Sequence, residues 1–244
     1  MSFCLVLLLL LALVNASPSA AFAHQHPIRT TFFPLRGGGS NSPPSEAPSK
    51  VIFVLGGPGA GKGTQCANLV QHLGLTHLSV GDLLRTERCD PTSPDGELIT
   101  SIINNGQLVP VEIAIRLLKK AMEKGLEDKP DSVFLIDGFP RSFENIDGWR
   151  AAMSTPVTLL GVLVFDCVIE TLTRRILSRG LTSGRSDDNV SAAQKRFATF
   201  HRQTVPVIER LITEGEHVVT INAEGDIDDV WEETRRVVED MIKS

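Results

Sequence analysis

The stretch that decides the fold is Val51-Ile-Phe-Val-Leu-Gly-Gly-Pro-Gly-Ala-Gly-Lys-Gly-Thr-Gln65. An apolar run stops there at a glycine-rich turn, and apolar residues then recur at helical spacing as far as Leu73. This pattern predicts a buried strand, a phosphate-binding loop and a helix. Glycines let successive backbone N–H groups of such a loop point inward, where they and the helix N-terminus hold a polyphosphate. Lys62 is then placed to reach the outer phosphates.

The glycine-rich loop is a variant of a known nucleotide-binding pattern. Residues Gly56 to Lys62 fit G-x-x-x-x-G-K-[ST], but Gly63 stands where a hydroxyl is expected and Thr64 follows it. Glycine-rich loops also form ordinary strand-to-helix turns. The lysine in register directly after a buried-type strand favours nucleotide binding over that alternative.

Composition limits the other functions of the chain. Its 244 residues, 42% of them hydrophobic, are enough for a sizeable core. The formal net charge of -5 argues against bulk neutralisation of nucleic-acid phosphates, so we expect no nucleic-acid partner. Cys4, Cys66, Cys89 and Cys167 show neither C-x-x-C nor metal-like spacing, and Cys4 lies in a segment expected to be removed. The other three are expected to be buried or free thiols in a reducing compartment.

The N-terminal 48 residues read as targeting sequence. Leu5 to Val14 is an apolar run half as long as a spanning helix requires, which predicts a signal peptide over residues 1–21 and no stable membrane anchor. Residues 22–48 have a transit-peptide composition, and Ser19-Ala-Ala-Phe-Ala23 resembles the Ala-Phe cleavage motif of presequences for complex plastids. We therefore expect a bipartite plastid presequence, with a secreted protein bearing a disordered tail as the alternative. The region before Cys4 has no Lys or Arg, which counts against the signal peptide.

After the phosphate loop, strands and helices alternate. Strands are predicted at Thr76–Val80, Val133–Asp137, Leu159–Asp166 and His217–Ile221. Strands that alternate with helices indicate a three-layer α/β fold with a central parallel sheet, which binds ligands at the carboxyl ends of its strands.

The helices between these strands have recognisable ends. The first is expected to end at Gly74, and Asp82 and Arg85 are expected to begin a short second helix. A third is expected to have Ser93 as its N-cap and to close at Gly106, and a fourth to start after Pro110 and stop at Gly125. Three helices between two strands exceed what one crossover needs, so Val80 to Val109 is expected to be an inserted subdomain.

The C-terminal part of the chain continues the alternation. A helix is expected at Ile169–Arg179, and the glycine-bracketed segment Gly180–Asn189 is expected to be a loop. A long helix from Ser191 to about Gly215 should break or bend near Pro206, and Asp226 or Asp228 should open the last helix.

Charged residues gather at the predicted ligand edge. Asp137 ends a strand, and a carboxylate there either caps a helix or orders Mg²⁺ and its waters; the phosphate-loop context favours the second. Five arginines flank glycine-bearing loops on the same side and are candidates for one anionic site: Arg85, Arg141, Arg179, Arg185 and Arg196. Phosphoryl transfer between two nucleotides needs such crowding of cations, because donor and acceptor phosphates repel each other.

With these residues in view, the chain resembles the nucleoside monophosphate kinases, and within them the UMP-CMP kinase family. The resemblance runs from about Lys50 to the C-terminus, so residues 49–244 would be the kinase domain. It rests on five motifs in one order: Gly56-Gly-Pro-Gly-Ala-Gly-Lys-Gly-Thr-Gln-Cys66, Gly81-Asp-Leu-Leu-Arg85, Gly106-Gln-Leu-Val-Pro110, Asp137-Gly-Phe-Pro-Arg141 and Ser183-Gly-Arg-Ser-Asp-Asp-Asn189.

The resemblance implies an acceptor-binding region near 79–109 and a short lid near 180–188. It implies that ATP is bound by Gly59, Ala60, Gly61, Lys62, Gly63, Thr64, Arg179 and Gly225. It implies that the acceptor nucleoside monophosphate is bound by Arg85, Gln107, Leu108, Val109, Gly138, Phe139, Pro140, Arg141, Asn145, Arg185 and Arg196. Lys62, Arg141, Arg179, Arg185 and Arg196 would act in catalysis, and Mg²⁺ would be held mainly through ATP and waters, with Thr64 and Asp137 as further ligands.

Asn145 carries the substrate assignment. Adenylate kinases have Gln at the matching position and UMP-CMP kinases have Asn, which suits the smaller pyrimidine. Val80 departs from both patterns, since adenylate kinases have Thr there and pyrimidine kinases Ala. The resemblance therefore implies a monomeric enzyme that phosphorylates UMP, CMP and dCMP with ATP in pyrimidine nucleotide biosynthesis.

Three alternatives stay open from the residues. Adenylate kinase uses the same chemistry on another base. A regulatory phosphate-loop GTPase is disfavoured because the chain has no Asn-Lys-x-Asp or Thr-Lys-x-Asp element to read guanine. A non-catalytic nucleotide-binding module would bind through Lys62 but transfer nothing. For the compartment, the cytoplasm or nucleus usual for the family is an alternative to the plastid.

Overall fold

The computed structural model describes residues 48–153, 157–183 and 188–243. The predicted signal peptide (1–21) and nearly all of the transit-like segment (22–48) lie outside these residues, as do residues 184–187 of the predicted lid, Arg185 among them. Within the described ranges, no helix combines the length and the apolar character that crossing a bilayer requires.

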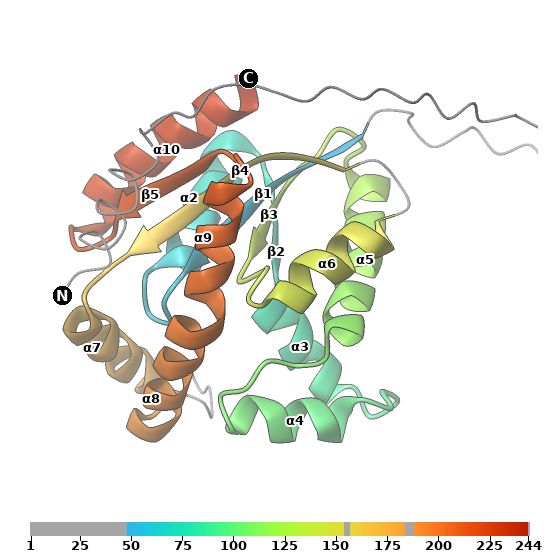
Figure 1. The fold of residues 1–244 in the computed structure, drawn as a ribbon, viewed down its shortest axis with the longest axis vertical. Coiled ribbons are helices and arrows are strands. Elements are labelled where there is room, and N and C mark those ends of the chain that lie inside the picture. The colour runs from blue at the N-terminus through green and yellow to red at the C-terminus, as the bar shows by residue number, and fades with distance from the viewer. Residues whose placement is uncertain (1–47, 154–156, 184–187, 244) are drawn as a thin grey trace, which may run out of the picture. The chain divides into compact units, whose positions relative to one another are not determined.

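Five parallel strands form the centre of the structure (Figure 1). They are β1 (Ser49–Gly56), β2 (Thr76–Ser79), β3 (Val133–Asp137), β4 (Val157–Asp166) and β5 (Val218–Asn222). Their order across the sheet is β2-β3-β1-β4-β5, and each neighbouring pair is parallel. The predicted α/β fold class with a central parallel sheet is confirmed.

Helices cover both faces of the sheet because side chains of a strand alternate in direction. Val51, Phe53 and Leu55 of β1 face one core cluster, and Ile52 and Val54 face the other. The first cluster is closed by α3 (Val80–Cys89), α4 (Gly96–Asn104), α5 (Val111–Asp128), α6 (Phe143–Ala152) and α9 (Val205–Thr213). The second is closed by α2 (Lys62–Leu73), α7 (Ile169–Gly180), α8 (Val190–Thr199) and α10 (Ile227–Lys243).

The topology places one loop at the centre of the ligand edge. The chain leaves β1, builds β2 and β3 on one side of it, and then β4 and β5 on the other. The loop after β1 therefore lies where the strand order reverses, the position at which open parallel sheets bind ligands.

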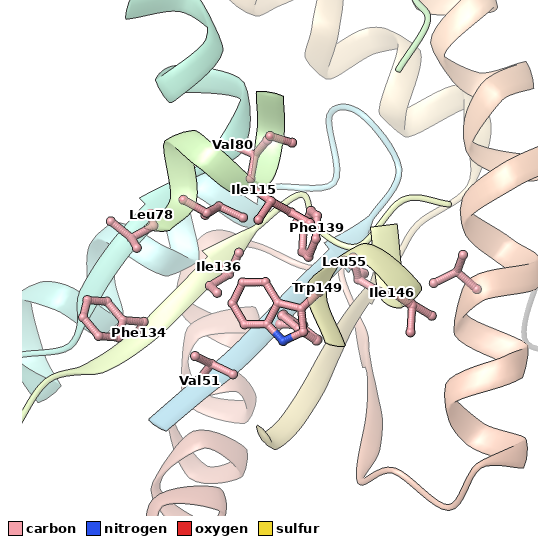
Figure 2. Packing of buried hydrophobic residues seen from close by; sticks show 14 of the residues in the cluster. Val51, Leu55, Leu78, Val80, Ile115, Phe134, Ile136, Phe139, Ile146 and Trp149 are labelled. Atoms are coloured by element: carbon pink, nitrogen blue, oxygen red, sulfur yellow. The ribbon is translucent and has the colours of Figure 1, made fainter. Parts of the chain in front are cut away.

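Three aromatic rings fix the loop that follows β3. Phe139 lies in this loop, and its ring centroid is 6.0 Å from that of Phe53 in β1 and 5.5 Å from that of Trp149 in α6. The rings of Phe53 and Trp149 are themselves 5.5 Å apart. Figure 2 shows Phe139 and Trp149 among the buried side chains over β1 and β3. Because Phe139 is 1% exposed, the residues on either side of it have a rigid support.

The expected stop at Gly125 is wrong, because α5 continues through it to Asp128. A β-carbon at Gly125 would lie 2.7 Å from Cε1 of Phe134 in β3. The glycine therefore serves close helix-to-strand packing, not helix termination. The stop expected at Gly74 is confirmed, with α2 ending at Leu73 and Gly74 at a φ of 64°.

The expected N-cap at Ser93 is also wrong. Helix α4 begins only at Gly96, with Asp95 before it. The Ser93 hydroxyl instead donates to Glu87 Oε1 (2.8 Å) and accepts from the Asp95 backbone N–H (3.2 Å). This serine therefore shapes the turn between α3 and α4 and leaves the helix start to Asp95.

The break expected near Pro206 is present and has a defined form. A π-helical turn, η1 (Phe200–Thr204), joins α8 to α9, and the Val205 backbone N–H donates to the Phe200 carbonyl. Pro206 has no N–H and cannot continue the α-helical hydrogen bonds, so the wider turn immediately before it accommodates the missing donor.

Candidate active site

The phosphate loop joins β1 to α2. Gly59 and Gly61 have φ values of 88° and 85°, which favour glycine at both positions. A β-carbon at Gly59 would lie 2.7 Å from the Leu172 carbonyl oxygen, so α7 packs directly against the loop. Helix α2 begins at Lys62, and the first N–H groups of a helix have no partner within it. The loop therefore has the form of an anion site.

Lys62 lies folded back into its own loop. Its Nζ donates to the carbonyl oxygens of Gly56 and Gly57, both at 2.9 Å. Burial lowers the pKa of Lys62 to about 8. The negative charge of Asp137 raises this pKa, and the nearby guanidinium of Arg141 lowers it further. A bound phosphate would compete with these backbone carbonyls for the ammonium group of Lys62.

Asp137 ends β3 beside the phosphate loop, paired in register with Val54 of β1. Its Oδ2 lies 3.5 Å from Nε2 of His77, at the outer limit of a hydrogen bond. Burial would raise the pKa of Asp137, but the His77 contact and the charges of Lys62 and Arg141 outweigh it and hold the pKa below its usual value. The carboxyl is therefore ionised at neutral pH.

A cleft of about 1180 Å³ opens at this edge of the sheet. Its walls include nearly all described residues that the sequence predicted for the site: Gly59, Ala60, Gly61, Lys62, Gly63, Thr64, Arg85, Gln107, Leu108, Val109, Asp137, Gly138, Phe139, Arg141, Asn145, Arg179, Arg196 and Gly225. Pro140 is the exception, because it is buried and does not line the cleft. It instead joins two residues that do line the cleft, Phe139 and Arg141.

Asn145 lies on helix α6, which was not among the predicted helices. Ser142 caps it by accepting the Asn145 backbone N–H (3.3 Å). The Asn145 side chain accepts the backbone N–H of Arg141 at its Oδ1 (3.0 Å) and is 7% exposed. Because a backbone N–H can only donate, the oxygen must face Arg141, and the Nδ2 donors are left to other partners.

The rest of this side of the cleft combines arginines with apolar walls. Arg141 folds back, and its Nε donates to the Gly138 carbonyl (2.6 Å). Arg85 pairs with Asp82 of its own helix at 2.5 Å. Val80, the residue that departs from both family patterns, is 6% exposed and lines the same wall. The wall is therefore suited to a flat base next to an anionic group.

Asp188, at the end of the predicted lid segment, pairs with two of the predicted arginines. Arg179 donates to both of its oxygens, Nε at 2.7 Å and Nη2 at 2.6 Å, and Arg196 Nη1 lies 3.4 Å from Oδ1. Burial would raise the pKa of Asp188, but the hydrogen bonds and charges of Arg179, with smaller contributions from Ser183 and Arg196, lower it. A buried carboxylate thus holds both guanidinium groups at one wall of the cleft. Its partner Ser183 donates from Oγ at 3.1 Å.

Sequence reasoning missed two arginines that also line the cleft, Arg174 and Arg175. Arg175 Nη1 donates to the Ala223 carbonyl (2.8 Å), and its Nη2 contacts the Gly225 carbonyl (3.4 Å). Arg175 therefore shapes the loop that carries Gly225. Arg175 precedes Arg179 by four residues on a predicted helix, so both lie on one face. This spacing could have indicated Arg175 as a site residue.

The donors present fit a hard divalent cation held mostly by other ligands. Thr64 and the ionised Asp137 both line the cleft and offer oxygen atoms, which Mg²⁺ prefers. Across the residues that the structure describes, no three His, Cys, Asp or Glu side chains are grouped to hold a metal ion. A cation bound here would thus take most of its ligands from phosphates and water.

The chain is similar to known kinases over most of its length. The sequence profile of the adenylate kinase family matches residues 54–216. The UMP-CMP kinase of Danio rerio is 47% identical over 191 residues, which cover 78% of this chain and 97% of the fish protein. The UMP-CMP kinases of Homo sapiens and Xenopus laevis are 47% and 48% identical over 188 residues, covering 77% of this chain and 95% and 97% of theirs. The chain therefore belongs to the UMP-CMP kinases of the adenylate kinase family.

Proposed function

We propose that this protein transfers the γ-phosphoryl group of ATP to UMP, CMP and dCMP. One observation carries the proposal: a single cleft combines a phosphate loop, four predicted arginines from four separate segments and the carboxamide of Asn145. Such a cleft can hold two anionic nucleotides end to end and read the base of one of them.

The reaction needs no side-chain base. An oxygen of the acceptor α-phosphate, already ionised at neutral pH, attacks the γ-phosphorus of ATP. The bond from that phosphorus to the β,γ-bridging oxygen breaks, and this oxygen leaves as part of ADP. The protein contributes alignment and positive charge, which offset the repulsion between the two phosphates.

The described cations divide this work between them. Lys62 exchanges its carbonyl partners at Gly56 and Gly57 for donor phosphates. Arg85 and Arg141 lie on the wall with Asn145 and hold the acceptor phosphate, while Arg179 and Arg196 approach the transferring group from the lid side. Bound Mg²⁺ would neutralise charge on the ATP phosphates, with Thr64 and Asp137 close to it. An arginine at the transferring group contributes on the order of 10³ to 10⁵ in rate.

A coupled assay with the purified chain tests this function. With ATP and Mg²⁺, we expect kcat/KM for UMP and CMP to exceed that for AMP. Lys62→Met should abolish transfer. A preference for AMP over both pyrimidine nucleotides would establish adenylate kinase instead, and ATP binding without any transfer would indicate the non-catalytic module.

Asn145 provides a sharper test of base recognition. We expect Asn145→Gln to lower kcat/KM for UMP and CMP by roughly tenfold or more and to gain activity on AMP, because a buried base edge left without its partner is costly. The KM for ATP serves as the internal control and should stay unchanged. Equal losses on all acceptors would argue against a role in base selection.

We propose further that the enzyme works as a monomer in plastid pyrimidine nucleotide biosynthesis. Support for the plastid comes from the sequence of residues 1–48 alone, through its composition and the motif Ser19-Ala-Ala-Phe-Ala23. A fluorescent fusion of residues 1–48 is expected in plastids; a cytosolic or secreted signal would remove the plastid assignment. Sedimentation equilibrium of the purified chain should give the mass of one copy.

A further inference from the structure

The π-helical turn η1 places two threonine hydroxyls against the loops of the acceptor side. Thr199, the last residue of α8, donates from Oγ1 to the Gly106 carbonyl (3.0 Å). Thr204, the last residue of η1, donates from Oγ1 to the Arg141 carbonyl (3.1 Å). Both threonines line the cleft, and their partners are 93 and 63 residues away in the chain.

The wide turn explains how the continuous helical segment α8–η1–α9 contacts both the Gly106 loop and the Arg141 loop. In an α-helix, residues five apart point about 140° away from each other, since 3.6 residues make a turn. In a π-helix the hydrogen bond closes between residues five apart, so such residues come close to the same face. The turn Phe200–Thr204 therefore lets Thr199 and Thr204 both face the acceptor side. π-Helical turns occur frequently at functional sites.

The first contact fixes the loop that leads into Gln107. Gly106 has a φ of 65°, and a β-carbon there would lie 2.9 Å from Cβ of Lys195 and 3.4 Å from Cγ of Arg196. The loop thus lies directly on α8 beside an arginine of the cleft. The Thr199 hydroxyl closes this contact with a directional bond.

The second contact fixes the residue that orients Asn145. The Arg141 carbonyl accepts from Thr204, which is 3% exposed, and the Arg141 N–H donates to Asn145 Oδ1. The Arg141 backbone is therefore held at both of its polar groups. Loss of the Thr204 bond removes one of these two restraints on the Arg141 backbone, whose N–H sets the direction of the Asn145 carboxamide.

We propose that Thr199 and Thr204 are positioning residues for the acceptor nucleotide, acting through the Gly106 and Arg141 carbonyls. The inference rests on the proposed function for the identity of the acceptor. The hydroxyls act on backbone that lines the acceptor side and leave the phosphate loop untouched, so their effect is confined to one of the two substrates.

The test compares Thr199→Val, Thr204→Val and the corresponding serine variants in the full chain. Valine keeps the shape and removes the donor, so we expect KM for UMP and CMP to rise roughly two- to tenfold, the value of one hydrogen bond. KM for ATP should stay within about twofold of that of the unchanged chain, a margin well below one hydrogen bond. Serine restores the hydroxyl and should restore KM for the acceptor.

Thr213→Val is the matched control. Thr213 is the last residue of α9, which continues from η1. It is exposed and donates from Oγ1 to the Glu209 carbonyl within its own helix (2.8 Å). Its replacement should leave both KM values unchanged. Thermal unfolding of every variant separates loss of folded protein from loss of positioning.

Three outcomes would overturn the proposal: unchanged KM for the acceptor in both valine variants, equal increases in KM for ATP and acceptor, or no recovery with serine. These outcomes leave the proposed function intact, because the unchanged chain still phosphorylates UMP and CMP. If the unchanged chain prefers AMP, the function fails and the same comparison is made with KM for AMP. If it transfers no phosphate, the dissociation constant for UMP, measured by calorimetry, replaces KM.

Discussion

At the scale of single residues, Lys62 makes the cleft sensitive to pH. Its ammonium group is buried, bonded to two backbone carbonyls, and has a pKa of about 8. Phosphates that replace those carbonyls favour the charged form and raise the pKa on binding. Binding of ATP is thus linked to uptake of a proton above about pH 8, where Lys62 is deprotonated before ATP binds.

We expect ATP affinity to fall as pH rises above about 8, by at most tenfold per pH unit for one linked proton. Below that pH Lys62 is charged in both states and little uptake occurs. Calorimetric titrations at pH 7 and pH 9, in buffers of different ionisation enthalpy, measure the uptake directly. Lys62→Met should remove it, and an unmodified chain that binds ATP at pH 9 without taking up a proton would contradict the assignment.

Arg175 is a cleft residue that could not be predicted from the residues next to it in the sequence. The positions carried by motifs, such as Arg85, Arg141 and Asn145, could be named because the residues on either side are informative. Arg175 lies in the middle of an ordinary amphipathic helix, and its partners are carbonyls of a loop 48 and 50 residues away. Only the fold, which places α7 next to the loop after β5, brings them together. Asp188 was part of a quoted motif, but its burial between two arginines likewise depends on how α7 and α8 lie in the fold.

At the scale of elements, close packing of α5 on β3 depends on Gly125. The sequence suggested a helix stop because glycine is a poor helix former. Alanine would favour the helix by about 1 kcal/mol, but its β-carbon would lie 2.7 Å from the ring of Phe134, which is fully buried. Overpacking in a core costs about 1–3 kcal/mol, so the steric effect should win.

We therefore expect Gly125→Ala to lower the free energy of unfolding by about 1–3 kcal/mol, measured by urea denaturation. Gly96→Ala is the control, because a β-carbon at Gly96 meets its nearest neighbour, the Arg88 carbonyl oxygen, at an ordinary 3.4 Å. That change should alter stability by less than about 0.5 kcal/mol. A stabilising effect of Gly125→Ala would show that the helix and strand can separate without cost.

Much of the element order was predictable, and the failures share a cause. Strands with buried-type runs, and the α2 stop at Gly74, follow from local patterns. Helix α6 was missed because Gly148 lies in the middle of its ten residues, and its stability comes from Ile146 and Trp149 packing in the core. The break near Pro206 was predictable, but no local pattern contains its π-helical form or the bonds of Thr199 and Thr204 to distant carbonyls.

At the scale of the whole molecule, charge is unevenly distributed. The formal net charge is -5, yet one cleft is lined by Lys62 and several arginines. A local cationic cleft draws nucleotides without making the surface generally attractive to polyanions. Away from the cleft, a chain of ion pairs joins α6 to α9: Arg150 contacts Glu214 at 2.6 Å, and Arg210 contacts Glu214 at 2.7 Å and Asp147 at 3.2 Å.

Glu214 links this network to acid stability. Hydrogen bonds from Arg150 and Arg210 lower the pKa of Glu214 from 4.5 to about 2. A carboxyl with a lowered pKa stabilises the fold above its unfolded pKa, and the contribution is lost as pH falls from about 4.5 towards 2.

We expect Glu214→Gln to lower the midpoint of thermal unfolding at pH 7, where the carboxylate is ionised in both states. The difference from the unchanged chain should shrink progressively below pH 4.5 as the network is protonated. Glu232→Gln is the comparison, because Glu232 contacts only Arg235 of its own helix, at 2.8 Å, among the contacts found in the described residues. A difference that is constant from pH 7 to pH 3 would mean that Glu214 acts through packing alone.

The place of β1 in the sheet has a consequence for biosynthesis. Among the described strands, β1 is the first to leave the ribosome, yet its two neighbours, β3 and β4, end only at Asp137 and Asp166. More than a hundred further residues must therefore be translated before both edges of β1 can pair. Until then the nascent chain exposes an apolar strand to which chaperones can bind.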